Sequence, residues 1–170
     1  FSSAAAILLR LKDCQGAASA PPAAFAVTKR VLGDEAHTAA RTESSTAVTA
    51  QPVAWALSEL TRAVSHERRL LITVDDADSL DSDSTAALAT LVSQIETCRA
   101  MLVIATRQAM APLSSAGATT LPLPELSHSD ARTLAALACA NPLSEGAVDR
   151  IATLSGGNPL YIRELAALDV

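Results

Sequence analysis

Aromatic side chains are scarce in this sequence: Phe, Trp and Tyr make up 2% of the 170 residues, although 49% of the residues are hydrophobic. Alanine and leucine must therefore fill most core positions, and these residues favour helices that pack closely on one another or on a sheet. A chain of this length is long enough to bury a core of its own.

Positive charge is also sparse. The net charge is −5 and no cluster of Lys and Arg marks a nucleic-acid surface, so we expect no direct nucleic acid contact by this segment. The only lysines, Lys12 and Lys29, neither follow a glycine nor precede Ser or Thr, so the phosphate-binding pattern G-x-x-x-x-G-K-S/T is missing. The G-x-S-x-G elbow of serine hydrolases and the G-x-G-x-x-G pattern of dinucleotide-binding proteins are missing as well.

Cysteines and histidines are few and scattered. Cys14, Cys98 and Cys139 are odd in number and lie far apart in apolar stretches, which predicts reduced core thiols and a cytoplasmic protein. The three histidines have no metal-ligand spacing with the cysteines. Apolar runs are too short to span a membrane, and no basic stretch of a signal peptide precedes the first of them. Because the first residue is Phe1 rather than Met, we expect a segment of a longer polypeptide.

The first part of the chain carries a weak helical pattern. The leucines of residues 8–11 indicate the end of one helix, a short second helix is expected at 23–32, and residues 33–51 are predicted to form a loop. Pro52 suits the first turn of a further helix, with Trp55 on the side opposite its apolar stripe. That stripe consists of Val53, Leu57, Leu60 and Val64.

Two short apolar runs, residues 70–74 (LLITV) and 101–106 (MLVIAT), predict two strands. The intervening residues 83–97 predict a helix, which Ser82 or Asp83 is expected to cap. The apolar stripe of this helix is Leu88, Leu91, Val92 and Ile95. This order predicts an α/β fold with a parallel sheet that is buried on both faces and a right-handed crossover.

The last part of the chain is predicted to contain one short strand at residues 119–123 and then helices. Ser127 with Asp130 resembles a capping box, with Asp in place of Glu or Gln. The helix that follows is expected to turn Leu134, Leu137 and Ala138 to one face. A second helix is predicted from residue 144 to residue 154, and Gly156 should end it.

The sharpest chemical feature is the pair Asp75-Asp76 at the end of the first strand. Ligands bind at the carboxyl ends of parallel strands, and a hydrated Mg²⁺ on nucleotide phosphates needs a fixed carboxylate nearby. Because adjacent strand residues point to opposite sides, Asp75 would hold the magnesium through water and Asp76 would orient the attacking water. Alternatively, the two acids cap the next helix or face solvent.

Thr106-Arg107 ends the following strand, where an Arg can stabilise spread phosphate charge. The alternative is an arginine that pairs with a nearby Asp or turns to solvent. Farther along the chain, the glycines Gly156 and Gly157 permit unusual backbone angles, and the helix that starts at Asn158-Pro159 offers N–H groups to an anion. The alternative there is an ordinary corner between two helices.

Together, these motifs resemble the signal-transduction ATPases with numerous domains, a branch of the AAA-type P-loop NTPases. The Walker B strand of that family ends in Asp-Asp, here LLITVDDADSLD (residues 70–81), and the next strand ends in Thr-Arg at sensor 1. The passage LPLPELSHSDARTL (121–134) then leads to a helical lid closed by Gly-x-Pro-Leu. The ending GNPLYIREL (157–165) is similar to the ATPase domains of large LuxR-type bacterial transcription regulators. The resemblance covers roughly residues 52–168.

The resemblance implies a P-loop NTPase-like three-layer fold with a parallel sheet, helices on both faces and a helical lid, incomplete at the N-terminus. Residues 1–122 would be a partial core with Walker B and sensor 1, and residues 123–170 the start of the lid. The lid would bring Gly157, Asn158 and Pro159 to the nucleotide, with the proline near the adenine or ribose.

For the core, the resemblance implies that Asp75 associates with Mg²⁺ through water and that Asp76 takes the catalytic-acid position. Arg107 would be sensor 1, beside Thr106. The departure from the family is the missing Walker A loop, so ATP and Mg²⁺ are expected to bind only when an upstream segment supplies it. This segment alone should then be inactive.

The function we predict is an ATP-binding regulatory switch with slow hydrolysis, in a multidomain bacterial signalling or transcription regulator. Its partners would be ATP or ADP and other domains of the same polypeptide, with a homo-oligomer left open and no membrane contact. The first alternative is a degenerate, non-catalytic interaction scaffold. A second alternative, an ATPase with steady turnover, is less favoured because such enzymes usually carry Glu after the Walker B Asp.

Overall fold

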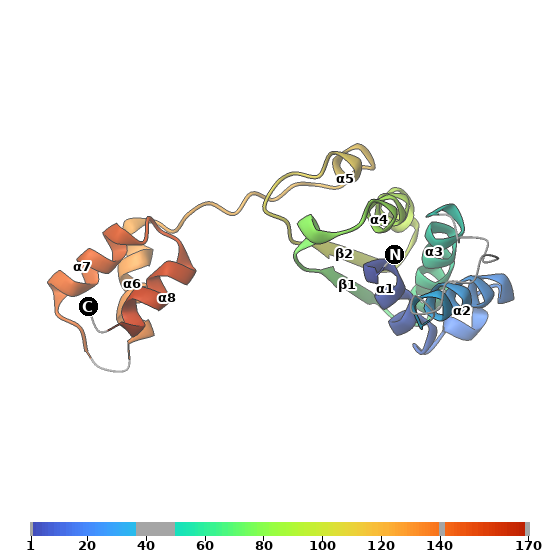
Figure 1. Ribbon diagram of the computed structural model, residues 1–170, viewed down its shortest axis with the longest axis horizontal. Coiled ribbons are helices and arrows are strands. Elements are labelled where there is room, and N and C mark those ends of the chain that lie inside the picture. The colour runs from blue at the N-terminus through green and yellow to red at the C-terminus, as the bar shows by residue number, and fades with distance from the viewer. Residues whose placement is uncertain (1, 37–49, 140–141, 169–170) are drawn as a thin grey trace. The chain divides into compact units, whose positions relative to one another are not determined.

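The computed structural model describes residues 2–36, 50–139 and 142–168 of the chain. The chain divides into two compact units, Phe1–Thr120 (unit 1) and Leu121–Val170 (unit 2), and each is described by itself (Figure 1). Unit 1 is mixed α/β and unit 2 is helical. No helix of the described ranges is both long enough and apolar enough to cross a membrane.

Unit 1 contains five helices and two strands within its described residues. In chain order these are α1 (Ser2–Lys12), α2 (Pro22–Ala36), α3 (Ala50–Glu67), β1 (Leu70–Val74), α4 (Ser82–Gln94), β2 (Ala100–Ile104) and α5 (Ala111–Ser115). The two early helices are confirmed, and α2 extends four residues past the predicted end. The predicted loop at 33–51 is therefore wrong at both ends, because α2 extends to Ala36 and α3 begins at Ala50. Its middle, residues 37–49, lies outside the described residues.

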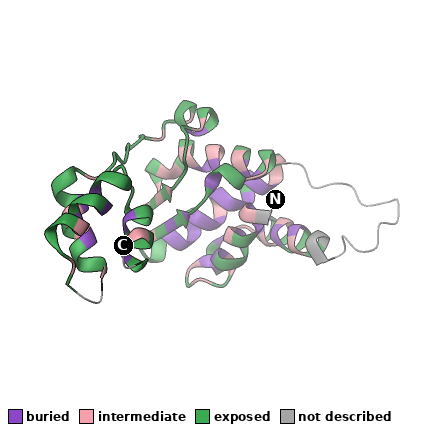
Figure 2. Cartoon of the chain, turned by 60° about the vertical axis from the view of Figure 1, so that its left-hand side comes forward, coloured by how far each residue is buried: buried purple, intermediate pink, exposed green. Residues whose placement is uncertain are grey.

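The sheet has the predicted parallel pairing. Strand β1 pairs with β2 in a register that runs from Leu70↔Ala100 to Val74↔Ile104. Helix α4 joins the two strands, and it packs against α3. The predicted stripe of α3 is fully buried, which places this helix at the centre of the unit 1 core (Figure 2).

The two faces of the sheet differ. Ile72 and Val74 on one face are buried in the same core as α1, α3 and α4. On the other face Leu71, Met101 and Val103 are 61%, 63% and 48% exposed. Within the described residues the helices of unit 1 cover one face of the sheet, so the predicted burial of both faces is not shown.

Among its described residues, unit 2 is a bundle of three helices: α6 (His128–Ala138), α7 (Glu145–Leu154) and α8 (Pro159–Ala167). Its small core consists of Ala131, Ala135, Val148, Ile151, Ala152, Ile162 and Ala166. The strand predicted at residues 119–123 does not form, since residues 118–127 lie in neither helix nor strand. Pro122 and Pro124 lack the amide hydrogens that a strand there would need.

Side chains cap the three described helices of unit 2; the caps at Ser127 and Asn158 were predicted, whereas Ser144 was expected to be the first residue of its helix and is its cap instead. Ser127 accepts a hydrogen bond from the Asp130 amide, Ser144 caps α7, and Asn158 caps α8 with proline at the first position. In unit 1 the cap of α4 is Asp81, which accepts from the Ser84 amide at 2.7 Å, and not Ser82 or Asp83. The helix begins at Ser82, one residue before the predicted start, so its cap is Asp81.

Two further predictions are corrected by burial. Helix α6 turns Ala131 and Ala135 into the core, with Leu134 half-buried, whereas Leu137 is 77% exposed and Ala138 is exposed too. Helix α6 contributes the alanines Ala131 and Ala135 to the small core of unit 2, and Leu137 lies outside that core. The three cysteines are free thiols, as predicted, but they are half-buried rather than core residues.

Candidate functional site

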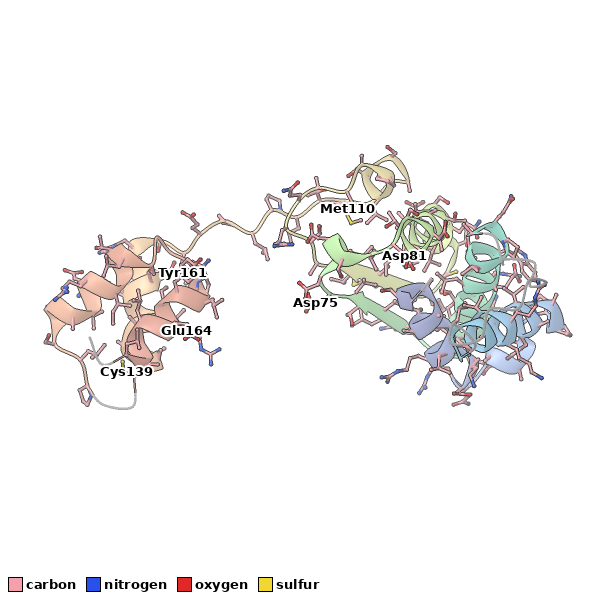
Figure 3. The ribbon with its side chains drawn as sticks, viewed as in Figure 1. Asp75, Asp81, Met110, Cys139, Tyr161 and Glu164 are labelled. Carbon is pink, nitrogen blue, oxygen red and sulfur yellow. The ribbon has the colours of Figure 1, made fainter. Side chains whose placement is uncertain are left out.

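The parallel pairing brings the ends of β1 and β2 to the same edge of the sheet. Hydrogen bonds continue the ladder beyond the strands: the Ala105 amide donates to the Val74 carbonyl at 2.8 Å, and the Ala77 amide donates to the Ala105 carbonyl at 2.9 Å. The loops that carry Asp75 and Thr106 are thus tied side by side. Figure 3 shows Asp75 at the end of β1, and its side chain is exposed.

Asp76 adopts a left-handed backbone conformation, with φ 50° and ψ 44°. It is the only non-glycine residue with positive φ in the part of the chain that the structure describes. Its amide donates to Asp75 Oδ1 at 2.9 Å, and its carbonyl accepts from the Ser79 amide at 2.9 Å and the Ser79 hydroxyl at 2.8 Å. Such strain persists where surrounding bonds hold it, and it often marks a functional loop.

This conformation changes the geometry that strand alternation predicts. Strand β1 ends at Val74, so Asp76 is a turn residue, and the expectation that the two acids point to opposite sides of a strand does not apply. Both carboxylates are exposed at the same edge. The side chain of Asp75 also accepts a hydrogen bond from the next residue, which orients it.

Asp78 is the residue that the sequence motifs did not single out. A short 3₁₀ turn, Ala77–Ser79, directs its carboxylate to the loop after β2. Asp78 Oδ1 lies 3.0 Å from the Thr106 hydroxyl, and Oδ2 accepts from the Arg107 amide at 2.8 Å. Asp78 therefore fastens the two strand-end loops together.

The electrostatics of this contact favour the charged carboxylate. The hydrogen bond from the Arg107 amide, assisted by the Thr106 hydroxyl and the Arg107 charge, lowers the pKa of Asp78 below its ordinary value of 3.8. The guanidinium of Arg107 is only loosely involved, since Nε lies 3.6 Å from Asp78 Oδ2 and the side chain is 85% exposed. The alternative that Arg107 pairs with a nearby Asp therefore holds mainly for its backbone amide. The guanidinium is exposed and could still contact a bound anion.

The side chains that the structure describes at this edge do not by themselves make a complete metal site. Within the described ranges, no group of three or more His, Cys, Asp and Glu side chains is arranged to hold a metal ion. Magnesium on a nucleotide, however, is commonly held by one or two carboxylates together with phosphate oxygens and water. Exposed carboxylates at Asp75 and Asp76 fit that second arrangement.

The lid motif of unit 2 is built differently. Gly157 is buried with φ 78°, and a Cβ added to it would lie 2.5 Å from the Leu126 carbonyl oxygen. Its own carbonyl accepts from the Leu126 amide at 3.0 Å. This turn therefore requires glycine in order to close the start of α6 against the start of α8.

The start of α8 has few amides left for an anion. Asn158 Oδ1 accepts from the Leu160 amide at 2.9 Å, and Pro159 has no amide hydrogen. Two of the groups at a helix start that could contact a phosphate are thus used or absent. The prediction that Gly157, Asn158 and Pro159 contact nucleotide concerns unit 2, and the structure gives these residues clear packing and capping roles there.

A separate hollow of about 360 Å³ lies on unit 2, lined by His128, Asp149, Arg150, Thr153 and Leu154. Its carboxylate, Asp149, already bonds to Arg132 and to His128, and the Arg132 hydrogen bond lowers the pKa of Asp149. The hollow contains none of the candidate site residues, although His128 lies in the passage 121–134. The strand ends of unit 1 therefore remain the candidate site.

Comparisons of the chain with protein-family models, with curated proteins and with solved structures found no match. The functional interpretation consequently depends on the strand-end geometry and on the motifs. Those two sources agree on one location in unit 1, the carboxyl ends of β1 and β2.

Proposed function

We propose that this chain is part of an ATP-binding regulatory switch with slow hydrolysis, of the signal-transduction ATPase class that it resembles. The observation that carries the proposal is the convergence of Asp75, Asp76 and Arg107 at one edge of a parallel strand pair, where Asp78 fastens the two loops. The proposal includes the finer fold: a three-layer P-loop core followed by a helical lid. It also includes a cytoplasmic location in a larger bacterial regulator.

Each polar residue at this edge has a distinct part in the proposed switch. Asp75, held by the Asp76 amide, binds the water shell of Mg²⁺, which would neutralise charge on the ATP phosphates. Asp76 projects a carboxylate from a rigid turn and orients the attacking water. Arg107 keeps its backbone fixed by Asp78 while its exposed guanidinium moves toward the γ-phosphate.

The gene itself supplies the first test. Residues encoded before Phe1 that contain G-x-x-x-x-G-K-S/T would support the switch, because that loop cradles the phosphates. Its absence there would favour the non-catalytic scaffold. The exposed apolar face of the sheet is the observation that supports this second function, since such a face suits contacts with other polypeptides.

The decisive test is binding of a fluorescent ATP analogue, with and without Mg²⁺, to the chain together with any residues encoded before Phe1. Asp75→Ala should weaken Mg-ATP binding by about tenfold or more and leave magnesium-free binding unchanged. Asp83→Ala is the matched control, because Asp83 is an exposed acid in the first turn of α4. Equal loss in both variants, or no nucleotide binding by the natural sequence, would reject the switch.

A further inference from the structure

The loop after β2 places a cation, Arg107, beside an anion, Asp78. Asp78 Oδ2 accepts from the Arg107 amide at 2.8 Å, and the same oxygen lies 3.6 Å from Arg107 Nε. The side chain of Asp78 is only 22% exposed, whereas that of Arg107 is 85% exposed. The anion is therefore held in place, and the guanidinium is the partner that can move.

Asp78 is fixed by contacts that do not involve the guanidinium. Its other oxygen, Oδ1, lies 3.0 Å from the Thr106 hydroxyl, and the turn that carries it is tied to the β2 loop by the bond from the Ala77 amide to the Ala105 carbonyl. Within the described ranges, no other carboxylate forms an ion pair with Arg107. Asp78 therefore keeps its position when the guanidinium moves away.

We propose that Asp78 is a counter-anion that holds the Arg107 guanidinium before nucleotide binds and releases it to a terminal phosphate. This inference rests on the proposed function, because the incoming anion is the nucleotide of the switch. The backbone amide of Arg107 stays on Asp78 in both states. Asp78 is thus a positioning residue, since it acts on the ligand only through Arg107.

The contact between the two side chains is weak enough to be exchanged. Exposed ion pairs contribute little to stability, because water competes for both charges and an ordered long side chain loses entropy. The guanidinium of Arg107 also shares Asp78 Oδ2 with a backbone amide that lies closer to it. A phosphate offers two oxygens at once, which is the arrangement that arginine binds best. The exchange therefore favours a phosphate ligand.

The charge of Asp78 selects the class of ligand. A carboxylate carries one negative charge, and so does a phosphodiester. A terminal phosphate carries roughly 1.5 to 2 negative charges at pH 7, so it attracts the guanidinium more strongly than Asp78 does. We therefore expect a preference for nucleotides with a free terminal phosphate. ATP should bind more tightly than ATP whose γ-phosphate is methylated.

The hold on Arg107 can be tested without nucleotide. In NMR spectra of the whole chain, Asp78→Asn should shift the Arg107 Nε–H signal and make that side chain more mobile. The Arg107 backbone amide should stay ordered, because the asparagine oxygen still accepts from it. Asp83→Asn is the matched control, since it removes the same charge from an exposed acid of α4, and it should leave both Arg107 signals unchanged.

The release is tested by binding of a fluorescent ATP analogue to the chain together with any residues encoded before Phe1. Asp78→Asn should bind the analogue about two- to fivefold more tightly, because the guanidinium has lost its competing anion. Asp83→Asn measures the general effect of one lost charge and should change the affinity less. In an Arg107→Gln background, Asp78→Asn should do no more than Asp83→Asn, since the coupling passes through the arginine.

Two further measurements complete the test. In Asp78→Asn the preference for ATP over its γ-methyl ester should narrow. In the natural sequence, ATP should shift the Arg107 Nε–H signal and leave hydrogen exchange of the Arg107 amide unchanged, a result that needs no variant to fold. Trp55 fluorescence checks that each variant is folded.

The inference and the proposed switch fail in different ways. An Arg107 Nε–H signal that ignores Asp78→Asn would overturn the inference alone, and so would weaker ATP binding in Asp78→Asn than in Asp83→Asn. Tighter binding that persists in the Arg107→Gln background would also overturn it, because the effect would then be one of general charge. Failure of the natural sequence to bind nucleotide would reject the switch and the release step together.

Discussion

Two turns of this molecule carry the motifs from which the sequence predicted a nucleotide site, and their hydrogen bonding and packing differ. In unit 1 the turn after β1 uses hydrogen bonds to hold its backbone and leaves the side chains of Asp75 and Asp76 exposed. In unit 2 the turn before α8 uses its glycine for close packing and its asparagine as a helix cap. The first turn leaves its two carboxylates exposed, whereas the second closes a helical bundle.

The comparison shows that a short sequence motif can predict a turn. It does not predict which side chains and amides of that turn remain available to a ligand. The difference can be measured separately in the two units, because the only Trp, Trp55, lies in unit 1 and the only Tyr, Tyr161, lies in unit 2. Fluorescence of each reports unfolding of its own unit. If the comparison is right, substitutions in the unit 2 turn lower the free energy of unfolding. Substitutions in the unit 1 turn chiefly lower nucleotide binding or hydrolysis.

The largest effect is expected for Gly157→Ala. A side chain there combines left-handed strain of about 1–2 kcal/mol with a clash against the Leu126 carbonyl, for a loss of roughly 3 kcal/mol or more in the free energy of unfolding. Gly156→Ala is the control, since Gly156 has φ 58° and open space, and about 1 kcal/mol is expected. Denaturant unfolding followed by Tyr161 measures both. Equal losses would show that the turn is not closed by packing.

Asn158→Ala should have a smaller effect, about 1 kcal/mol, because it removes the cap that accepts from the Leu160 amide. Asn158→Asp should restore most of the stability, since aspartate caps equally well. The same Tyr161 unfolding curves provide the measurement. If the alanine variant lost nucleotide binding while its stability was unchanged, Asn158 would act on the ligand and the contrast between the two turns would fail.

The contact that Asp78 makes between the two strand-end loops should depend on pH. Its pKa is lowered, so the contact with the Arg107 amide is complete above the ordinary value of 3.8 and is lost as the pH falls through the lowered value. The amide chemical shift of Arg107 should follow this titration, and Asp78→Asn should abolish it. Asp83→Asn should leave it in place. A titration that persists in Asp78→Asn would mean that another group fastens the loops.

The smallest change in stability is expected for Asp76→Gly. Glycine relieves the left-handed strain but makes the unfolded chain more flexible, so the net change should stay within about 0.5 kcal/mol. The same substitution removes the carboxylate that the proposed switch uses to orient water. The unfolding curve followed by Trp55 fluorescence should therefore stay nearly unchanged, whereas ATP hydrolysis by the complete polypeptide should fall. A large loss of stability would make Asp76 a structural residue.

Local patterns predicted the elements of this fold well, because their causes are local. The apolar run at 70–74 became β1, and the run predicted as a strand at 101–106 became β2, which spans Ala100–Ile104. The α3 stripe became the centre of the core, and Asn158-Pro159 began a helix. The parallel pairing followed from the order strand, helix, strand, with strands that are apolar throughout. Element ends were less accurate, as the cap of α4 shows, because neighbouring Asp and Ser residues can serve equally well.

Contacts between distant residues were not predictable from the sequence. The bond between Asp78 and Thr106 spans 28 residues and depends on the direction of a 3₁₀ turn. The apolar run LLITV shows which residues favour burial but not whether a partner covers both faces. Gly157 was noticed for its backbone freedom, yet the reason for it, the carbonyl of Leu126, lies in another part of the sequence.

One hydrogen bond bears on the order in which unit 1 can form during synthesis. The Ala4 amide donates to the buried Ser84 hydroxyl across 80 residues, and α1 packs against α3 and α4. Proteins are made from the N-terminus, so α1 can pack against α2 and α3 before α4 has been synthesised. The bond to Ser84 and the contact with α4 can form only after residue 84 has left the ribosome. The attachment of α1 to α4 should therefore be a late step in the assembly of the unit 1 core during translation.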